Sequence, residues 1–239
     1  KIDGKALYDA YIHMLKNAYI RIQITGKEYN GRFDEAFKKA ITPFRTEKDF
    51  SLPRSQAKQN DGVTEFSEKA PINQAKLCLG FTSENISDNP AITVFADIFG
   101  GGPYSKLFSN VREKQSLCYY CSASARRAKG FLTVESGVEE ANAQKTVDAV
   151  LRELEDMKNG NFEDSVIEAS KKSITDSLYG YYDSANALDI WYSREICEEI
   201  SPAEAAEVIK NLTREDIMKA AMGIKLHTIY RLLPKEVKA

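Results

Sequence analysis

The sequence predicts an α+β fold: one domain of two layers, with a mostly antiparallel or mixed sheet covered by helices on one side. Several segments alternate apolar and polar residues with the period of a half-buried strand, and other segments carry an apolar stripe at helical spacing. The predicted helices follow pairs of strands, which is typical of a sheet with a helical layer. The strand–helix–strand alternation of a nucleotide-binding fold is not evident in the sequence.

Two helices and a strand are predicted before the first long connection. Residues 3–15 carry apolar residues at helical spacing. In residues 19–25 three isoleucines alternate with polar residues, which predicts a half-buried strand. Residues 31–43 carry an apolar stripe of aromatic and aliphatic residues that predicts a second helix. The polar segment 51–63, interrupted by Pro53, is predicted to be the longest connection.

The middle of the chain is predicted to contain three strands and two helices. The strands are expected over residues 74–81, 117–125 and 130–138, and the helices over residues 88–99 and 104–113. The first helix ends at three consecutive glycines. The last two strands are joined by the basic residues 126–129, whose like charges favour a solvated hairpin tip over a site for a peptide carboxylate.

The last part of the chain is predicted to be mainly helical. A helix over 143–158 ends at Asn159-Gly160, and a longer helical region over 162–199 is interrupted near 180–183. Two further helices begin at Ser201 and Thr213, each with the residue pattern of a capping box. An alternating strand over residues 226–233 is expected to close the chain.

Composition limits the possible functions. The chain has 239 residues and 43% hydrophobic content, which fits a single domain over residues 1–239. Its 33 basic and 35 acidic residues give a net charge of −2, which argues against a nucleic-acid or membrane-binding surface. No apolar run approaches the roughly 18 residues of a membrane span. Four scattered cysteines favour a reducing cytoplasm, and the first residues, which lack a Met and a signal-like apolar core, suggest a piece of a longer chain.

The most informative segment reads FGGGPYSKLFSNVREKQSLCY and covers residues 99–119. Gly100, Gly101 and Gly102 precede a short amphipathic helix, and Arg112 and Tyr119 follow seven residues apart. A phosphate-binding loop is disfavoured because neither G-x-G-x-x-G nor G-x-x-x-x-G-K-[ST] spacing is present. The residues by themselves favour a tight helix–helix connection where the backbone passes closely.

This segment resembles the glycine turn and the R-E-K-x-x-L-x-Y signature in the C-terminal half of pitrilysin-like zinc metallopeptidases, the family of insulysin and mitochondrial processing peptidase. The order of predicted elements is similar to that half from about residue 3 to 233. The family carries its zinc on an H-x-x-E-H helix in the other half, and this sequence has no such motif. The resemblance therefore implies a metal-free half, with no cofactor in this chain and zinc in its partner half.

The resemblance also implies roles for individual residues. Arg112 and Tyr119 would reach across a chamber to the metal-bearing half, bind the substrate backbone and stabilise the oxygen of the scissile carbonyl. The three glycines would face the same chamber and contact the substrate. Tyr120 is a competing tyrosine, and because adjacent strand residues face opposite sides, only one of the two is expected to point into the chamber. Cys118 stands where the family commonly has a small residue.

Each of these residues also has a purely structural interpretation. An arginine near the end of a helix is favoured by the helix dipole, and a strand tyrosine can simply pack its ring. Cys118 and Cys121 are predicted to point to opposite faces of a strand and to be structural rather than redox-active. The strand over 131–137 is a candidate edge for binding a peptide as an added strand, or an ordinary internal strand. The two histidines have no neighbours with metal-ligand spacing.

Three functions remain open from the sequence. The chain is the metal-free half of a zinc peptidase that works with a metal-bearing half, or a non-catalytic subunit of that family for assembly or peptide capture, or a peptide-binding scaffold without a protease partner. It is not expected to be catalytic alone. Its expected partners are a peptide substrate and a metal-bearing half or subunit, with a homo-oligomer as a further option.

Overall fold

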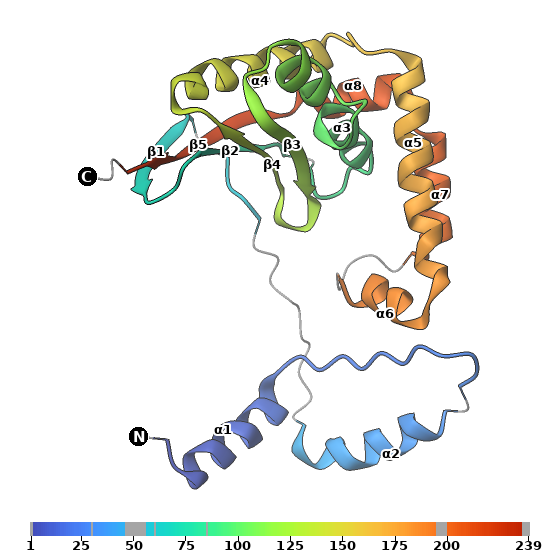
Figure 1. Cartoon of the computed structure of the whole chain (residues 1–239). Coiled ribbons are helices and arrows are strands. Elements are labelled where there is room, and N and C mark those ends of the chain that lie inside the picture. The colour runs from blue at the N-terminus through green and yellow to red at the C-terminus, as the bar shows by residue number, and fades with distance from the viewer. Residues whose placement is uncertain are drawn as a thin grey trace. The chain divides into compact units, whose positions relative to one another are not determined.

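The computed structural model describes residues 2–29, 31–45, 56–59, 61–84, 86–194 and 200–235. Contacts within the chain divide it into two units (Figure 1). Unit 1 consists of Lys1–Arg54 and Tyr181–Glu199, and unit 2 of Ser55–Gly180 and Ile200–Ala239. The prediction of one family domain over residues 1–239 stays a prediction.

Unit 2 is built on a five-stranded mixed sheet (Figure 1). Its strands are β1 (Thr64–Ala70), β2 (Ala75–Thr82), β3 (Cys118–Arg126), β4 (Phe131–Val138) and β5 (Lys225–Pro234). They lie in the order β1-β5-β2-β4-β3, with β1 parallel to β5 and the other neighbours antiparallel. The predicted mixed sheet is therefore confirmed. The strand predicted as a possible edge, β4, is internal, and β3 forms the edge instead.

One face of this sheet is buried under helices. In β2 the side chains of Leu77, Leu79 and Phe81 are buried, while the residues between them are half-buried. The covering helices include α3 (Ala91–Gly100), α4 (Ala143–Lys158) and α8 (Arg214–Met222). Each fully buried Leu or Phe contributes roughly 1.5–3 kcal/mol relative to an exposed one, so this layer holds most of the stability of unit 2. The predicted α+β architecture is confirmed.

The other helices of unit 2 also follow the sequence. They are α5 (Asp164–Tyr179) and α7 (Pro202–Asn211), which pack on each other, together with short 3₁₀ turns η3 (Arg127–Lys129) and η4 (Glu140–Asn142). Capping boxes are present at Ser201 with Glu204 and at Thr213 with Asp216, as predicted. A further turn, η5 (Gly180–Asp183), lies at the predicted interruption of the long helical region. Residues 51–55 and 195–199, at the predicted long connection and at the end of that region, lie outside the described residues.

Strand β1 was not predicted from the sequence. Six of its seven residues are exposed, so the strand has no apolar face and no apolar–polar alternation. Its main chain pairs with β5 from Thr64 opposite Thr228 to Ala70 opposite Pro234. A polar, charged strand at the edge of a sheet commonly protects the sheet from pairing with strands of other molecules. Because such a strand has the residue composition of a loop, the sequence did not predict it.

Unit 1 contains α1 (Gly4–Asn17), α2 (Arg32–Ile41), the turn η1 (Thr42–Phe44) and α6 (Ala185–Arg194). The Arg45 guanidinium donates hydrogen bonds to the carbonyl oxygens of Leu15 and Ala18, at 3.0 and 2.5 Å, and so satisfies acceptors at the end of α1. Among its described residues none is buried. The described part of unit 1 therefore contains no buried core.

The half-buried strand predicted over residues 19–25 is not formed. This segment is extended but pairs with no strand among the described residues, and Ile22 and Ile24 are 42% and 48% exposed. The prediction was wrong because an alternation of apolar and polar residues indicates only that a segment suits a sheet. A strand also needs a neighbouring strand, and the described chain provides none for this segment. Within the described residues, no helix is both long and apolar enough to cross a lipid bilayer.

Candidate functional site

The five site residues predicted from the sequence line a single pocket of unit 2. The pocket has a volume of about 370 Å³ and is broadly open to solvent. Its walls come from the glycine loop after α3, from the following helix and from the first half of β3. The lining residues are Gly100, Gly101, Gly102, Pro103, Phe108, Arg112, Tyr119, Tyr120, Cys121 and Ser122. The structure thus brings together the five predicted residues, of which Gly100 and Tyr119 lie 19 positions apart in the chain.

Gly100 allows α3 and β3 to approach each other closely, and Gly101 lies tightly against the preceding turn of α3. A methyl group added to Gly100 would lie 2.5 Å from the backbone nitrogen of Ala123, much closer than non-bonded atoms come. A methyl group on Gly101 would collide with Asp97. Neither glycine has a positive φ, so close approach rather than left-handed backbone explains them. The interpretation of the loop as a close passage of the backbone agrees with this packing.

The helix that carries Arg112 is a π-helix, η2 (Leu107–Lys114). A short helix is present as predicted, but with an uncommon hydrogen-bonding pattern that is often found at functional sites. Leu107 and Val111 are fully buried and fix its inner side. Before its first turn, the Lys106 ammonium lies 3.2 Å from the Glu153 carboxylate of α4, which also accepts a hydrogen bond from Asn110 at 2.8 Å. This polar anchor holds the helix on α4.

Arg112 is held in place by its own helix. The carbon of its guanidinium group lies 4.6 Å from the centre of the Phe108 ring, and one nitrogen lies 3.4 Å from the carboxylate of Glu113. Its side chain remains 38% exposed. Stacking on an aromatic ring orients the guanidinium plane and leaves N–H donors available at its edge. Phe108, which the sequence analysis did not single out, is therefore a positioning residue for Arg112.

Tyr119 is displayed by a β-bulge. Cys118 pairs with Val138 and Tyr120 pairs with Gly137, so Tyr119 is an extra residue in β3 without a partner in β4. Tyr119 is 58% exposed, and its hydroxyl donates a long hydrogen bond of 3.4 Å to the Glu139 carboxylate. The chain enters the strand through Ser116, whose φ of 51° is rare for a residue with a side chain.

The bulge breaks the expected alternation of Tyr119 and Tyr120, whereas the prediction that only one of them points into a chamber shared with another half stays a prediction. Both Tyr119 and Tyr120 line the pocket, because an extra residue breaks the strict alternation of faces. The Tyr120 ring covers Gly137 of β4, and the Lys76 ammonium lies 5.1 Å from the ring centre. Burial, and next the nearby Glu135 carboxylate, raise the pKa of Tyr120.

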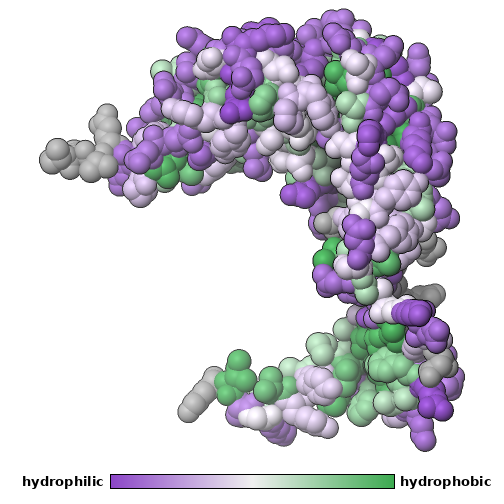
Figure 2. All heavy atoms as spheres, turned by 45° about the vertical axis from the view of Figure 1, so that its right-hand side comes forward, coloured by the Kyte–Doolittle hydropathy of each residue, from purple (hydrophilic) through white to green (hydrophobic). Residues whose placement is uncertain are grey.

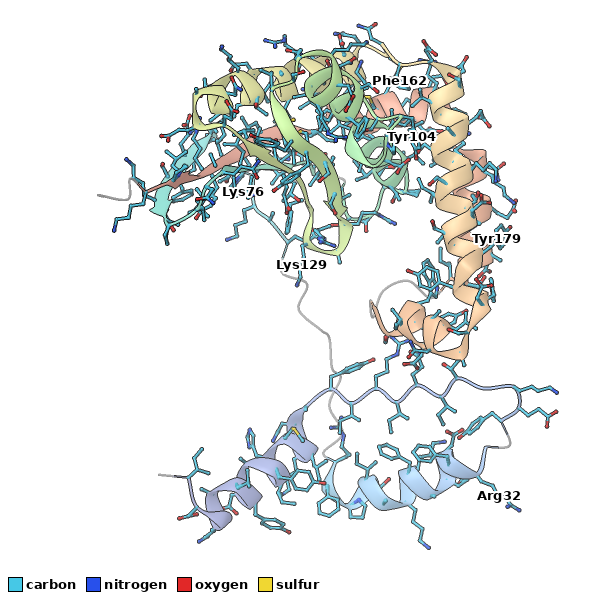
Figure 3. All side chains as sticks on the ribbon, in the orientation of Figure 1. Arg32, Lys76, Tyr104, Lys129, Phe162 and Tyr179 are labelled. Atoms are coloured by element: carbon cyan, nitrogen blue, oxygen red, sulfur yellow. The ribbon has the colours of Figure 1, made fainter. Side chains whose placement is uncertain are left out.

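The basic residues predicted at the hairpin tip lie between β3 and β4. Figure 3 shows Lys129 at this tip and also labels Lys76, whose ammonium lies over the Tyr120 ring.

The same bulge brings two cysteines together. The thiols of Cys118 and Cys121 hydrogen-bond to each other, so the prediction that they face opposite sides of the strand was wrong. The hydrogen bond from Cys121 lowers the pKa of Cys118 to about 7, with further contributions from Ser136 and the positive charge of Arg112. The pKa of Cys121 is raised, first by its hydrogen bond to Cys118 and then by burial.

The described residues contain no group of three or more His, Cys, Asp or Glu side chains that could hold a metal ion. The two histidines belong to different units. His13 contacts Asn17 within α1, and the Nδ1 atom of His227 lies 2.7 Å from the hydroxyl of Thr228. What the pocket offers is thus a set of hydrogen-bond donors: a guanidinium, two phenols, a hydroxyl and the main chain of a glycine loop.

Known proteins resemble the chain in sequence and in fold. It is 32% identical over 238 residues to a protein of Bacillus subtilis named "Probable inactive metalloprotease YmfF", covering 97% of this chain and 55% of that protein. A conserved protein from Enterococcus faecalis V583 superposes with a TM-score of 0.74 at 28% identity, over 86% of this chain and 51% of that one. The chain thus spans about half the length of these two relatives.

A second similar structure is shorter than these two relatives. It is an inactive peptidase domain from Bordetella parapertussis, with a TM-score of 0.56 at 12% identity, and 96% of it matches 69% of this chain. The family model described as "Peptidase M16 inactive domain" matches residues 1–174, well over half of the sequence. Together with the 32% identity to the Bacillus relative, this match confirms the resemblance predicted from the sequence. The chain belongs to the Peptidase M16 inactive domain family.

Proposed function

We propose that the chain is the metal-free half of a zinc peptidase and supplies Arg112 and Tyr119 to a peptide held against a metal-bearing half. One observation carries this proposal: Arg112, Tyr119 and the three glycines line one open pocket. We call the metal-bearing polypeptide the companion half, and it is recognised by an H-x-x-E-H motif in the same or a neighbouring gene. The chain contributes donors, and the companion half contributes the zinc.

The chemistry of the pocket suits this role. Peptide hydrolysis builds negative charge on the carbonyl oxygen, and donors that are already fixed in place stabilise that charge most effectively. Arg112 is held on Phe108, and Tyr119 is displayed by the bulge, so neither needs to be reorganised. The pocket is open to water on its own, so a covering surface is needed to make the hydrogen bonds strong. We assign that covering surface to the companion half.

A second candidate function is a non-catalytic member of the same family that captures peptides or supports assembly. The observation that favours it is the name of the Bacillus relative, which describes that whole protein as a probable inactive metalloprotease. In this case the polypeptide that takes the place of the companion half also lacks zinc, and the pocket binds peptide without cleaving it. For either function the free thiols of the described cysteines are consistent with a reducing cytoplasm, where we place the protein.

The test is peptide cleavage by the chain combined with its companion half. Tyr119→Phe is expected to lower kcat by about 100-fold with little change in KM, because a donor to the oxyanion acts mostly in the transition state. Arg112→Ala is expected to raise KM as well, because it binds the peptide backbone before and during the reaction. Tyr179→Phe is the matched control, since that tyrosine lies in α5 outside the pocket and bonds to Glu207 and Lys210.

The outcomes separate the candidates. Full turnover of both pocket variants, with the complex intact, would overturn the catalytic role. If the wild-type complex binds a fluorescent peptide without cleaving it, and Arg112→Ala weakens that binding while Tyr179→Phe does not, the second candidate is correct. Tyr120→Phe tests the choice of tyrosine, because Tyr120 shares the pocket and Tyr119 was chosen by the spacing of the signature. Loss of turnover in Tyr120→Phe with full turnover in Tyr119→Phe would move the assignment to Tyr120.

A further inference from the structure

We infer that Cys118 and Cys121 form a dithiol site that is oxidised by a hydroperoxide, and that the resulting disulfide alters the pocket beside it. Both cysteines are free thiols in the structure. The ring that the disulfide closes contains only two further residues, Tyr119 and Tyr120, and both line the pocket. Formation of the disulfide is independent of the proposed function, whereas its effect on a bound peptide rests on that function.

The bulge in β3 places the two thiols on one side of the strand. Cys118 is half-buried and Cys121 is 5% exposed, whereas the two tyrosines between them are 58% and 40% exposed. In a regular strand, residues three positions apart point to opposite faces. The extra residue cancels one step of that alternation, and the two thiols hydrogen-bond to each other. A disulfide requires two cysteine side chains that point toward each other, and this pair meets the requirement.

The surroundings of the pair favour a thiolate on Cys118. The hydrogen bond from Cys121 lowers the pKa of Cys118 to about 7. Ser136 adds a second hydrogen bond, and the guanidinium of Arg112 adds a positive charge. Hydrogen-bond donors and nearby cations are the usual features of a reactive cysteine. We therefore assign Cys118 as the thiol that attacks the peroxide and the buried Cys121 as the thiol that completes the disulfide.

The oxidation has two steps. In the first, the Cys118 thiolate attacks one oxygen of hydrogen peroxide. The S–O bond forms, the O–O bond breaks, and the hydroxide that leaves takes up the proton released by the thiol. In the second, the Cys121 sulfur attacks the sulfur of this sulfenic acid, so that the S–S bond forms and the S–O bond breaks. The departing hydroxide takes the Cys121 proton and leaves as water. The two thiols thus lose two electrons and two protons, and the peroxide is reduced to two water molecules.

The first step also prepares the second. The pKa of Cys121 is raised first by its hydrogen bond to Cys118, then by burial, and then by the negative charge of the Cys118 thiolate. Conversion of that thiolate to a sulfenic acid removes the charge and weakens the hydrogen bond. Cys121 therefore loses its proton more readily after Cys118 has been oxidised.

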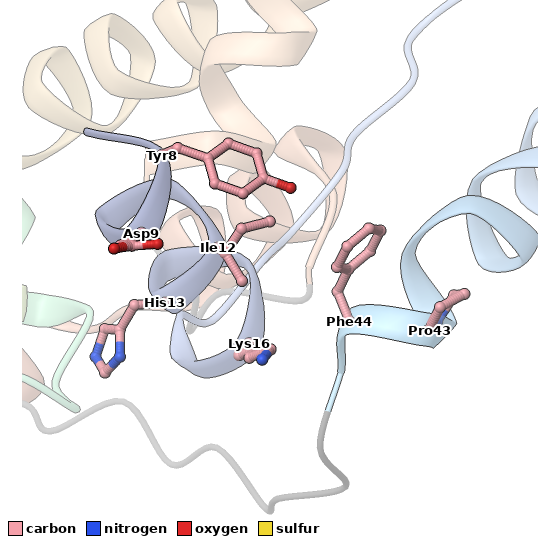
Figure 4. A pocket seen from close by; sticks show the side chains of 7 residues that line it. All are labelled: Tyr8, Asp9, Ile12, His13, Lys16, Pro43 and Phe44. Atoms are coloured by element: carbon pink, nitrogen blue, oxygen red, sulfur yellow. The ribbon is translucent and has the colours of Figure 1, made fainter. Parts of the chain in front are cut away.

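Other groups in the described chain provide comparisons for this site. Met14 belongs to unit 1 and is 50% exposed. Figure 2 shows that hydrophobic side chains gather on the surface of this unit. The hollow of about 540 Å³ in the same unit is lined by His13 and Lys16 among others, but by no thiol (Figure 4). A peroxide therefore acts on unit 1 by oxidising a thioether such as that of Met14, which adds an oxygen atom instead of forming a disulfide.

The test is oxidation of the chain alone by hydrogen peroxide, followed by digestion with trypsin and mass spectrometry without reduction. Cleavage after Lys114 and Arg126 releases one peptide that contains both cysteines and no methionine. The expected product is this peptide lacking two hydrogen atoms, and glutathione is expected to restore them. Near pH 7 the product is expected to form at least about 10-fold faster than Cys78 is oxidised, because burial raises the pKa of Cys78 and the thiolate is the reactive form.

Two variants separate the roles of the two thiols. In Cys121→Ala, treated at about pH 9 to ionise Cys118, the reaction is expected to stop at a sulfenic acid that dimedone traps as a covalent adduct. In Cys118→Ser, the buried thiol of Cys121 is expected to be oxidised at least about 10-fold more slowly than Cys118 of the wild type. The melting temperature of each variant checks its folding, and the result for the wild type depends on neither variant.

The effect on the pocket is measured after the oxidised chain has been freed of peroxide and combined with its companion half. Turnover is expected to be about 10-fold lower than with the reduced chain, because a small displacement of Tyr119 misaligns its hydroxyl. If the complex binds a fluorescent peptide without cleaving it, the affinity for that peptide is compared instead. In Cys118→Ser, which forms no disulfide in the peptide, the ratio between treated and untreated samples is expected to stay near one.

Three outcomes would overturn the inference. Persistence of both thiols under conditions that oxidise Met14 would exclude the dithiol site. A disulfide that joins this peptide to Cys78 or to another copy of the chain would show that the two thiols do not meet. A disulfide within the peptide that leaves turnover and peptide binding unchanged would refute the effect on the pocket. The proposed function is tested separately, because Tyr119→Phe keeps both cysteines: disulfide formation at the wild-type rate with full turnover of the reduced variant would support the dithiol site and refute the catalytic role.

Discussion

At the scale of single residues, the bulge in β3 is the feature with the most consequences. It displays Tyr119, turns Tyr120 toward the same pocket and brings the thiols of Cys118 and Cys121 together. The resemblance of this segment to the metallopeptidase signature predicted that Arg112 and Tyr119 belong to one site, and the two residues do line one pocket. The faces of the strand residues could not be predicted, because an inserted residue reverses the alternation and leaves no mark in the residue pattern.

The first prediction concerns the thiol of Cys118. Its pKa of about 7 means that it is protonated and unreactive below that pH and a thiolate above it. Alkylation of Cys118 by iodoacetamide, followed by mass spectrometry of the peptide, is expected to reach half its maximal rate near pH 7. Cys121→Ala removes the thiol that donates to Cys118 and is expected to shift the midpoint up toward the ordinary value of about 8.5.

Cys78 provides an internal control in the same experiment. Burial, and next the Glu135 carboxylate, raise its pKa, so its alkylation is expected to require a more alkaline pH than that of Cys118. A common midpoint for Cys78 and Cys118 would contradict the contact between the two thiols in β3.

The second prediction concerns the glycine loop. Gly100→Ala is expected to lower the free energy of unfolding by about 1–3 kcal/mol, because the new methyl group would lie 2.5 Å from the Ala123 nitrogen. Gly102→Ala is the matched control, since its methyl group would meet only the Tyr104 ring, at 3.3 Å, and is expected to cost less than about 1 kcal/mol. Urea denaturation of both variants measures the difference.

The same two variants also test whether the glycine loop contacts the substrate. If Gly102→Ala retains its stability but loses turnover in the complex with the companion half, the loop also guides substrate. Equal destabilisation by the two substitutions would contradict the close approach of Gly100 to β3.

At the scale of elements, the helices and strands that have a buried face could be predicted from the sequence. Strands with a buried face, such as β2, and helices with an apolar stripe, such as α4, were found from their periods. Strand β1 was missed because nearly all of it is exposed, and the π-helical form of η2 was missed because its sequence has the ordinary pattern of an amphipathic helix. Strand β1 is defined by its pairing with β5, and η2 is held against α4 by the Lys106–Glu153 ion pair.

The third prediction belongs to that anchor. The side chains of Lys106 and Glu153 are only 12% and 9% exposed, so Lys106→Met would leave a nearly buried carboxylate with Asn110 as its main donor. We expect a loss of about 3 kcal/mol in the free energy of unfolding. The double variant Lys106→Met, Glu153→Met removes the unpaired charge and is expected to recover most of this loss.

An exposed ion pair serves as the control for the anchor. The side chains of Lys172 and Asp176 in α5 are 75% and 62% exposed. Lys172→Met is therefore expected to change the free energy of unfolding by less than about 0.5 kcal/mol. Similar losses for Lys106→Met and Lys172→Met would contradict the anchoring of the π-helix through a buried carboxylate.

At the scale of the whole molecule, the two units differ in how completely the chain specifies them. Unit 2 buries the sheet face and its covering helices, and its architecture could be predicted from the sequence. Unit 1 has the sequence of a strand and two helices, but none of its described residues is buried. Its alternation therefore predicted a strand that has no partner in the described part of the chain. A pattern of apolar residues shows that a segment is to be buried, but it does not show which polypeptide buries it.

The last prediction concerns metal and activity. The purified chain is expected to bind less than 0.1 zinc per molecule and to cleave no peptide, because a zinc site needs three or four converging ligands. The sequence has only two histidines, and they belong to different units. Elemental analysis of a tag-free sample measures the zinc, and peptide cleavage is assayed in parallel. Addition of a companion half with an intact H-x-x-E-H motif is expected to bring both zinc and cleavage to the complex. One tightly bound zinc per chain in the absence of that half would refute the division of labour proposed for the two halves.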